Sequence, residues 1–322
     1  MSEVLLSICI PAYNRPENII NILNRVTAFQ SDEIEIVISD DNIASDVNFN
    51  VVRAFKDPRV KYFCNKKNLQ YDANLLKAIE KSEGKFIFIL MDDDEPEMRS
   101  LPWLLNTIKI TKNLSQICGS SIMKGSEPAS YVHKSEEEFF VSGEESLNAL
   151  LFNLYHGSGI VLRRSDLDIQ QAKKFIGFLY MQQVLVAQTL IRGDTLCTSR
   201  IFANIGTNLD SKQPLYKGRP YHSYVCRLLQ AGIRIKIIEE IGKASKKQLP
   251  GLIEKQILVI YDNLFLIILE KKSLADLYEG TKIIIKIVYN SHSLIFLLKL
   301  MIYLPKWLIV KIRKLCRSGI HL

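Results

Sequence analysis

Three consecutive carboxylates follow a clear apolar segment in the first third of the chain. Asp92, Asp93 and Asp94 come directly after the run Lys85–Met91. Adjacent carboxylates repel one another and lose hydration energy when they are partly buried, so a positive partner stabilises them. A Mg²⁺ or Mn²⁺ ion shared with a diphosphate provides one, because hard cations take oxygen ligands from one or two carboxylates plus phosphate. The run therefore predicts a divalent cation held by Asp93 and Asp94.

The same run has a simpler interpretation as a solvated acidic turn before the helix that follows Pro96, because acids are favourable near a helix start. Its position favours the metal. Three other polar clusters each follow a predicted strand in the same way, at Pro11–Arg15, Ser39–Asn42 and Asn65–Asn68. Parallel strands present their carboxyl ends at one edge of a sheet, where ligands bind, so we expect the four clusters to meet there.

The second of these clusters contributes two further carboxylates. Asp40 and Asp41 follow the apolar run Ile34–Ser39. Such carboxylates can accept hydrogen bonds from the imide of a nucleotide base or from a ribose hydroxyl, although Asp and Asn are also common in tight turns. Together with the predicted cation, they indicate one wall of a site for a nucleoside diphosphate.

The elements that position these clusters can be predicted from periodicity. Over residues 1–120, short apolar runs alternate with segments in which apolar residues recur at helical spacing. This alternation predicts an α/β fold with a Rossmann-like, mostly parallel sheet flanked by helices. The predicted strands are Leu5–Ile10, Ile34–Ser39, Val60–Cys64, Lys85–Met91 and Gln116–Ser121, and the predicted helices are Asn18–Phe29, Val47–Phe55, Tyr71–Lys81 and Leu101–Thr111.

The rest of the chain is less regular. Helical patterns at Ser142–Leu154 and Phe178–Ile191 lie on either side of a short strand pattern at Gly159–Leu162, and the chain is helical and strongly apolar after Pro250. We expect a donor-binding half in residues 1–120, an acceptor-binding half of the same domain in residues 121–245, and a helical extension in residues 246–322.

The last part of the chain is basic as well as apolar. The formal net charge is +8, and residues 280–322 carry eight basic and no acidic side chains. Residues 293–317 combine an apolar run, Tyr303 and Trp307 with a basic face, which suits a helix lying in the interface of an anionic membrane. A terminal core helix with a solvated basic end is the alternative. No run reaches the roughly 18–20 apolar residues of a membrane span.

Several other classes of function lack support in the sequence. The basic charge lies in an apolar tail, so we expect no nucleic-acid partner. The six cysteines form no C-x-x-C pair and are expected to be reduced thiols. The glycine-rich nucleotide loops, the zinc motif H-E-x-x-H and the G-x-S-x-G elbow are missing. The start of the chain shows no charged segment followed by an apolar stretch, so we expect a cytoplasmic protein, peripheral on the inner face of the inner membrane.

Residues 4–205 resemble a family 2 glycosyltransferase with the GT-A fold. Ser7–Arg15 is similar to the opening nucleotide-binding strand and loop of that family, and Ile38–Asn42 to its second strand. Asp92–Asp94 occupies the position of its D-x-D motif. The resemblance implies transfer of a sugar from a nucleotide-sugar donor. It places donor contacts at Pro11, Tyr13, Asn14, Arg15, Asp40, Asp41, Asn68, Asp72, Asn74 and Asp92.

The chain departs from the family pattern at two places. Gln70 replaces the glycine that usually follows Asn68 by two positions, and Tyr180–Gln183 has no carboxylate where many members carry the catalytic base. The stretch Phe175–Tyr180 instead resembles a subgroup that includes abequosyltransferases. That resemblance implies a lipid-linked saccharide acceptor in O-antigen or other surface polysaccharide synthesis.

The group that would deprotonate the acceptor is left open. An inverting transferase needs a carboxylate or an imidazole at the acceptor hydroxyl, and the candidates are Asp166, Asp168 and His156. A retaining enzyme needs no such base. The residues expected to contact the acceptor or the transferred sugar are Gly159, Tyr180 and Gln182.

Two alternatives to a glycosyltransferase are also considered. A nucleotidyltransferase would share the nucleotide and metal chemistry, but it ordinarily has a glycine-rich basic loop that Pro11–Arg15 does not provide. A non-catalytic, membrane-associated scaffold that binds nucleotide sugars would agree with the Met-Gln-Gln segment at 181–183.

Overall fold

The computed structural model describes most of the first 206 residues and one long helix beyond them. The described residues are 3–42, 50, 52, 54–123, 136–151, 157–177, 180–206, 215–216, 219–220, 224–245, 256, 307–308 and 310–311. The chain divides into two compact units, Met1–Asp210 and Ser211–Leu322. The functional division into a donor half, an acceptor half and an extension stays a prediction.

The first unit contains a mixed β-sheet. Its strand order is β3-β2-β1-β4-β8-β6-β9-β5, and β7 pairs with β9. Four neighbouring strands are parallel: β3 (Val60–Cys64), β2 (Ile34–Asp40), β1 (Leu6–Ala12) and β4 (Phe86–Ile89). The other strands are β5 (Glu95–Pro96), β6 (Leu114–Met123), β7 (Glu137–Phe140), β8 (Ile160–Arg163) and β9 (Asp194–Ile205).

The sheet is less parallel than the sequence pattern predicts. β8 is antiparallel to both β4 and β6, and β5 and β7 are antiparallel to β9. The antiparallel pairing of β6 and β8 places Met123, the last residue of β6, and Ile160, the first residue of β8, at the same edge of the sheet. Parallel pairing would require a crossover to the other edge. The expectation of a mostly parallel sheet therefore holds for β1–β4 and for the pair β6 and β9.

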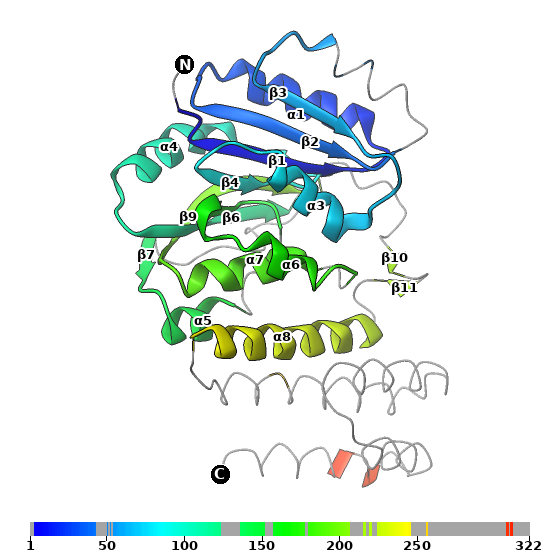
Figure 1. The fold of residues 1–322 in the computed structure, drawn as a ribbon, viewed down its shortest axis with the longest axis vertical. Helices are drawn as coiled ribbons and strands as arrows, with labels where there is room; N and C mark the ends of the chain where they lie inside the picture. Colours follow the sequence, from blue (N-terminus) through cyan, green and yellow to red (C-terminus); the bar gives the residue numbers. More distant parts are fainter. Residues whose placement is uncertain are drawn as a thin grey trace. The chain divides into compact units, whose positions relative to one another are not determined.

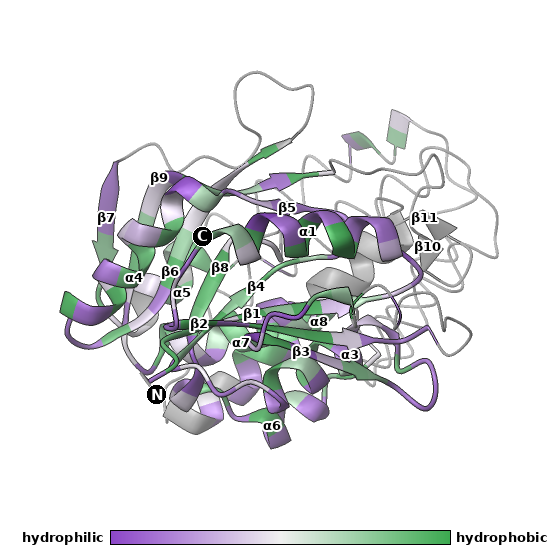
Figure 2. Cartoon of the chain, turned by 90° about the horizontal axis from the view of Figure 1, so that it is seen from above, coloured by the Kyte–Doolittle hydropathy of each residue, from purple (hydrophilic) through white to green (hydrophobic). Residues whose placement is uncertain are grey.

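Helices cover both faces of the sheet. α1 (Pro16–Ala28) and α4 (Leu101–Ile110) lie on one face, and α3 (Gln70–Glu80), α6 (Ile169–Lys173) and α7 (Met181–Leu190) lie on the other (Figures 1 and 2). Side chains alternate along each strand, so Leu6, Ile8 and Ile10 of β1 join the core formed with α1 and α4. α1 begins at a proline, whose fixed φ suits the first helical position.

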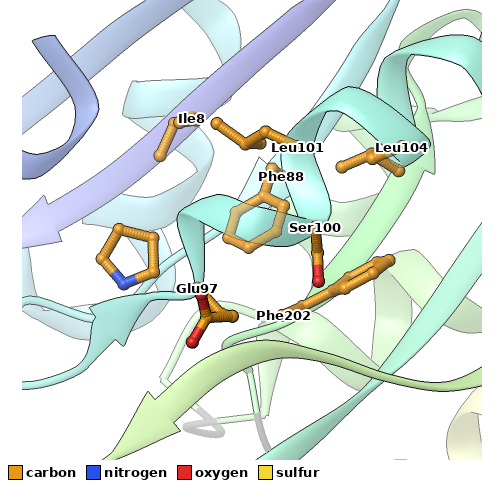
Figure 3. Close-up of a pocket in the computed structure, with 8 residues that line it drawn as sticks. Ile8, Phe88, Glu97, Ser100, Leu101, Leu104 and Phe202 are labelled. Atoms are coloured by element: carbon orange, nitrogen blue, oxygen red, sulfur yellow. The ribbon is translucent and has the colours of Figure 1, made fainter. Parts of the chain in front are cut away.

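A small apolar pocket lies beneath the start of α4 (Figure 3). It is lined by Ile8, Phe88, Pro96, Glu97, Ser100, Leu101, Leu104 and Phe202. The rings of Phe88 and Phe202 are 6.1 Å apart between centroids. None of the predicted donor residues lines this pocket, so we interpret it as a feature of core packing.

The second unit is described mainly through α8 (Tyr224–Ser245) and the short hairpin of β10 (Leu215–Tyr216) and β11 (Arg219–Pro220). Most of residues 293–317 lie outside the described residues. Within that segment Trp307 is described as 67% exposed. In the described part of the chain, no helix is both long enough and apolar enough to cross a membrane.

Candidate active site

The three consecutive carboxylates lie around a tight turn at the carboxyl end of β4. The backbone N–H of Asp94 donates to the carbonyl of Met91 at 3.2 Å, which closes the turn. We call Met91–Asp94 the acidic turn. Asp92 and Asp93 occupy its two central positions, so their side chains leave the backbone in different directions and meet different partners.

Asp92 joins the acidic turn to the loop after β1. Its Oδ1 accepts from Nη1 of Arg15 at 2.5 Å, and its Oδ2 accepts from the backbone N–H of Tyr13 at 2.8 Å. The same guanidinium lies 3.6 Å from the carboxylate of Asp93. Burial raises the pKa of Asp92 to about 6, although the charge of Arg15 acts in the opposite direction. Arg15 thus supplies part of the positive charge that the cluster needs.

Asp94 is turned toward protein donors. Its Oδ2 accepts from the hydroxyl of Ser158 at 2.6 Å, and its Oδ1 accepts from the backbone N–H of Gly206 at 2.8 Å. Burial, reinforced by the negative charge of Asp93, raises the pKa of Asp94 to about 7. Asp93 is more accessible, with 29% of its side chain exposed against 7% for Asp92.

The donor set fits a divalent cation only in part. In the part of the chain that the structure describes, no three His, Cys, Asp or Glu side chains converge as a ready-made metal site. Asp93 presents the accessible carboxylate, and Mg²⁺ commonly combines one or two carboxylates with phosphate and water. A cation at this turn would therefore take most of its ligands from a bound diphosphate. Both oxygens of Asp94 already accept hydrogen bonds from the protein. Its role as a second metal ligand stays a prediction.

The carboxylates after β2 are fixed by neighbouring strands. Asp40 accepts from the backbone N–H of Asn42 at 2.9 Å and from the hydroxyl of Tyr62 at 2.6 Å. Asp41 accepts from Nδ2 of Asn65 at 2.9 Å and from the backbone N–H of Leu69 at 3.0 Å. Burial raises the pKa of Asp41. Both carboxylates are thus held in defined orientations at the edge where the donor is expected.

The loop after β1 lies beside this second cluster. Pro11 pairs with Ser39 in the sheet, which aligns the ends of β1 and β2. Asn14 has a φ of +55°, a conformation that Asn tolerates, and its Oδ1 accepts from Nδ2 of Asn42 at 3.1 Å. Tyr13 is 54% exposed and presents an aromatic ring at the surface. The structure therefore brings Tyr13, Asn14 and Arg15 together with the acidic turn, as predicted.

The predicted donor residues around the start of α3 make hydrogen bonds within the loop before the helix and to the end of β1. The side chain of Asn68 accepts from the backbone N–H of Gln70 at 2.8 Å. Gln70 has a φ of +65°, a conformation that glycine adopts without strain, which explains why a glycine is usual there. Asn74 is buried and donates to the carbonyl of Ala12 at 3.1 Å.

Asp72, one of the expected donor contacts, is buried and bonds to the protein backbone. It is 1% exposed and accepts from the backbone N–H groups of Gly177 at 2.8 Å and Met181 at 3.2 Å. These bonds attach α3 to the start of α7. Asp72 and Asn74 are therefore buried residues that hold neighbouring segments together, and they do not lie on the open surface of the site.

The predicted acceptor residues lie near the acidic turn. The hydroxyl of Tyr71 donates to Oε1 of Gln182 at 3.0 Å, and Tyr180 directly precedes α7. A Cβ built on Gly157 would lie 2.1 Å from Cε of Met91 and 3.5 Å from the hydroxyl of Tyr71. Gly159 follows, with its N–H donating to the carbonyl at the end of β4.

The carboxylates predicted as bases lie elsewhere. β8 is antiparallel to β4, so its end at Arg163 pairs with Phe86, at the amino end of β4. Asp166 follows there and accepts from Nε of Arg163 at 2.7 Å, and Asp168 caps α6 through the backbone N–H of Gln171. Both lie at the edge opposite the acidic turn, so the structure does not bring them together with the predicted donor residues. His156 lies outside the described residues.

Sequence reasoning also missed several residues of the site. Ser158, Gly206 and Tyr62 all bond to the aspartates that it identified. Of these, only Ser158 had a local signal, because it stands between two glycines in the stretch 157–159. The others come from distant strands and loops, and only the sheet order brings them to the same edge.

Comparisons with known proteins agree with this architecture. The family model described as "Glycosyl transferase family 2" matches residues 7–169, half of the chain. A relative from Campylobacter jejuni, GalNAc(5)-diNAcBac-PP-undecaprenol beta-1,3-glucosyltransferase, is 27% identical over 121 residues. That match covers 37% of this chain and only 38% of the relative's length.

Solved structures extend the likeness in fold to most of the chain. S. aureus TarS 1–349 superposes with a TM-score of 0.62 at 14% identity, covering 88% of this chain and 81% of TarS 1–349. Its complex with UDP-GlcNAc gives a TM-score of 0.67 at 13% identity, with 88% and 80% covered. At these identities the likeness shows a shared fold. The matched family model, which includes the loop after β1 and the acidic turn, shows that the chain belongs to glycosyl transferase family 2.

Proposed function

We propose that this glycosyltransferase moves a sugar from a nucleoside-diphosphate donor to a lipid-linked saccharide during synthesis of a bacterial surface polysaccharide such as O-antigen. The observation that carries the proposal is the meeting of Arg15, the acidic turn and Asp40 at one edge of the sheet. The proposal is supported by the UDP-GlcNAc complex of TarS and by the PP-undecaprenol substrate in the name of the C. jejuni relative.

The donor would lie across the carboxyl ends of β1, β2 and β4. Tyr13, Asn14 and Asp40 would contact the base and ribose, and Arg15 would contact the diphosphate. Asp93 would hold a Mg²⁺ or Mn²⁺ ion, and Asp94 would be its second carboxylate ligand. Such an ion stabilises the negative charge that develops on a departing diphosphate. The residues of the chain orient the donor and keep its diphosphate against a positive side chain.

The acceptor would approach from the side of Gly159, Tyr180 and Gln182. Its hydroxyl oxygen forms a bond to the anomeric carbon while the bond from that carbon to the diphosphate oxygen breaks. The stretch Tyr180–Gln183 has no carboxylate where an inverting enzyme is expected to carry its base, so the acceptor proton passes to another group. The stereochemistry of the product identifies the group that takes this proton. If the configuration at the anomeric carbon is retained, the group is a phosphate oxygen of the donor. If the configuration is inverted, it is a separate base, for which His156 is the candidate.

Donor binding is the first test. Titration of the full chain with UDP, GDP, CDP, ADP and dTDP, with and without Mn²⁺, should reveal at least one ligand whose affinity depends on the metal. Asp93→Asn should abolish that dependence. Asp32→Asn is the matched control, because Asp32 is exposed in the turn before β2, at the opposite edge of the sheet. Loss of metal dependence in both variants, or in neither, would contradict the assignment.

Transfer is the second test, and it separates an enzyme from a scaffold. The full chain is incubated with radiolabelled nucleotide sugars and a lipid extract, and label in the lipid fraction is measured. We expect transfer from one donor that also binds. A protein that binds nucleotide tightly yet transfers nothing to any lipid acceptor would instead be a nucleotide-sugar-binding scaffold.

A further inference from the structure

One hydroxyl contacts both ends of the acidic turn. The hydroxyl oxygen of Ser158 accepts from the backbone N–H of Met91 at 2.8 Å and donates to Oδ2 of Asp94 at 2.6 Å. Met91 and Asp94 are the first and last residues of the turn, which the bond between their backbones closes. The central residues, Asp92 and Asp93, are thus carried on a turn that Ser158 fixes at both ends.

The surrounding chain is shaped to bring this hydroxyl so close. Ser158 is 2% exposed and stands between two glycines. A Cβ on Gly157 would lie 2.1 Å from Met91, and Gly159 has a φ of +92°, in the region that favours glycine. Bulkier residues at either position would push Ser158 away from the turn.

The other oxygen of Asp94 is fixed independently. Its Oδ1 accepts from the backbone N–H of Gly206, the residue that follows β9. The Asp94 carboxylate therefore connects the acidic turn to two segments that are distant in sequence, through the Ser158 hydroxyl and the Gly206 backbone. Only a group that accepts and donates at once can replace the hydroxyl.

We propose that Ser158 is a positioning residue of the transferase. It holds the acidic turn in the orientation that presents Asp93 to a cation and to the diphosphate of the donor. This inference rests on the proposed function, because it assigns to Ser158 an effect on metal-supported donor binding. Ser158 acts through the Asp94 carboxylate and the backbone of Met91.

The test compares nucleotide binding with and without metal. The probe is the nucleoside diphosphate that binds the wild-type full chain most tightly in the panel above, titrated in Mn²⁺ and in EDTA. Ser158→Ala should weaken binding in Mn²⁺ about tenfold and leave binding in EDTA within about twofold of wild type. A purely structural defect would weaken both equally, and that result would overturn the inference.

Two further variants keep the test decisive. Ser121→Ala is the matched control, because the Ser121 hydroxyl is buried and contacts the carbonyl of Ser158 at 3.4 Å rather than the acidic turn. It should bind like wild type in both conditions. Ser158→Cys has a similar side-chain volume but a much weaker hydrogen-bonding group. It replaces Ser158→Ala in the same titrations if Ser158→Ala does not fold. Wild-type affinity of both Ser158 variants in Mn²⁺ would overturn the inference alone. Failure of the wild type to bind any nucleotide would overturn the proposed function, and the inference with it.

Discussion

Arg15 changes how the charge of the acidic turn is balanced. Three adjacent carboxylates suggest a bound cation when only the sequence is considered, because their mutual repulsion needs a positive partner. The guanidinium of Arg15 already lies 2.5 Å from Asp92 and 3.6 Å from Asp93. A divalent cation entering the site would share these carboxylates with Arg15. On the proposed function, the arginine and such a cation would therefore compete for these carboxylates until a diphosphate binds both.

This competition predicts the effect of removing Arg15. Arg15→Gln should raise the affinity of the nucleotide-free protein for Mn²⁺ by about fivefold, since a half-exposed ion pair contributes about 1 kcal/mol. Arg25→Gln is the control, because Arg25 pairs with Glu95 at 2.8 Å, next to the acidic turn, rather than with Asp92 or Asp93. Mn²⁺ titration followed by electron paramagnetic resonance measures both. Equal changes in the two variants would show a general charge effect rather than competition.

Asp94 makes the stability of the metal-free protein depend on pH. Burial raises its folded-state pKa from 3.8 to about 7, so between pH 4 and 7 the folded protein holds a proton that the unfolded chain has lost. Stability from this group is therefore present at low pH and decreases as pH rises through that window. Asp94→Asn removes this titration and should reduce the loss of unfolding free energy between pH 5 and pH 8 by about 2 to 3 kcal/mol.

Urea unfolding of wild type and Asp94→Asn at both pH values, without divalent cation, measures the difference. Groups such as Glu35, whose pKa is lowered, act in the opposite direction in both proteins and cancel in the comparison. An identical pH dependence in the two proteins would show that Asp94 is ionised throughout.

Part of the candidate site could be predicted from the sequence, and physical reasons explain which residues could be found and which could not. Asp40 and Asp92 were identified because each directly follows an apolar run, and Arg15 because it belongs to the polar cluster after the first run. Asp72 accepts a bond from the backbone of Gly177 and Asp166 accepts one from the side chain of Arg163, and sequence spacing does not tell whether a carboxylate faces solvent or a protein donor. For Asp166 the direction of β8 decides the matter, and nothing in a four-residue strand specifies its direction.

Among the elements, α3 and α7 depend on each other. The first turn of α3 contributes Asp72, whose carboxylate accepts from the backbone at Gly177 and Met181, and Tyr71, which donates to Gln182. α7 has no side-chain cap of its own at Tyr180. Asp72 thus serves as a cap for α7 that is supplied from another helix.

Removing this cap should be costly. Asp72→Ala leaves two backbone N–H groups without their acceptor, and we expect a loss of about 2 to 4 kcal/mol of unfolding free energy. Glu80→Ala is the control, because Glu80 bonds Lys173 at 2.7 Å between the same layers, with both side chains partly exposed. That exposed pair should contribute less than about 1 kcal/mol. Urea unfolding of both variants gives the comparison, and equal losses would contradict the capping role.

The regular elements were easier to predict than their arrangement. The strand Val60–Cys64 has the predicted bounds, and the helix predicted at Tyr71–Lys81 is observed at Gln70–Glu80. β9 was missed because Asp194–Ile205 mixes polar and apolar residues without clear alternation. β5, with two residues, is too short for any periodicity. Apolar runs therefore locate the central strands, whereas the edge of the sheet is set by pairing between distant segments.

At the scale of the whole molecule, the charge is divided unevenly. The basic residues without acidic counterparts lie in 280–322, and the sheet with the acidic turn lies in Met1–Asp210. An acceptor carried on a lipid diphosphate would be found at a membrane whose surface is anionic. Basic side chains near such a surface contribute about 1 kcal/mol each, and this attraction weakens as salt rises. The proposed role of residues 293–317 follows from this combination.

The full chain should therefore bind anionic vesicles. We expect cosedimentation with vesicles of phosphatidylglycerol and phosphatidylethanolamine, weak binding to phosphatidylcholine alone, and release at high salt. Replacing Lys306, Lys311, Arg313 and Lys314 with glutamine should reduce binding at least tenfold, because four attractive charges are lost. Trp307→Ala should weaken binding in a way that salt does not modulate, since the exposed ring contributes apolar contact. The matched control replaces Lys56, Lys66, Lys67 and Lys77 with glutamine and so loses the same charge from the first unit. An equal loss of vesicle binding in the two four-residue variants would place the membrane contact outside residues 293–317.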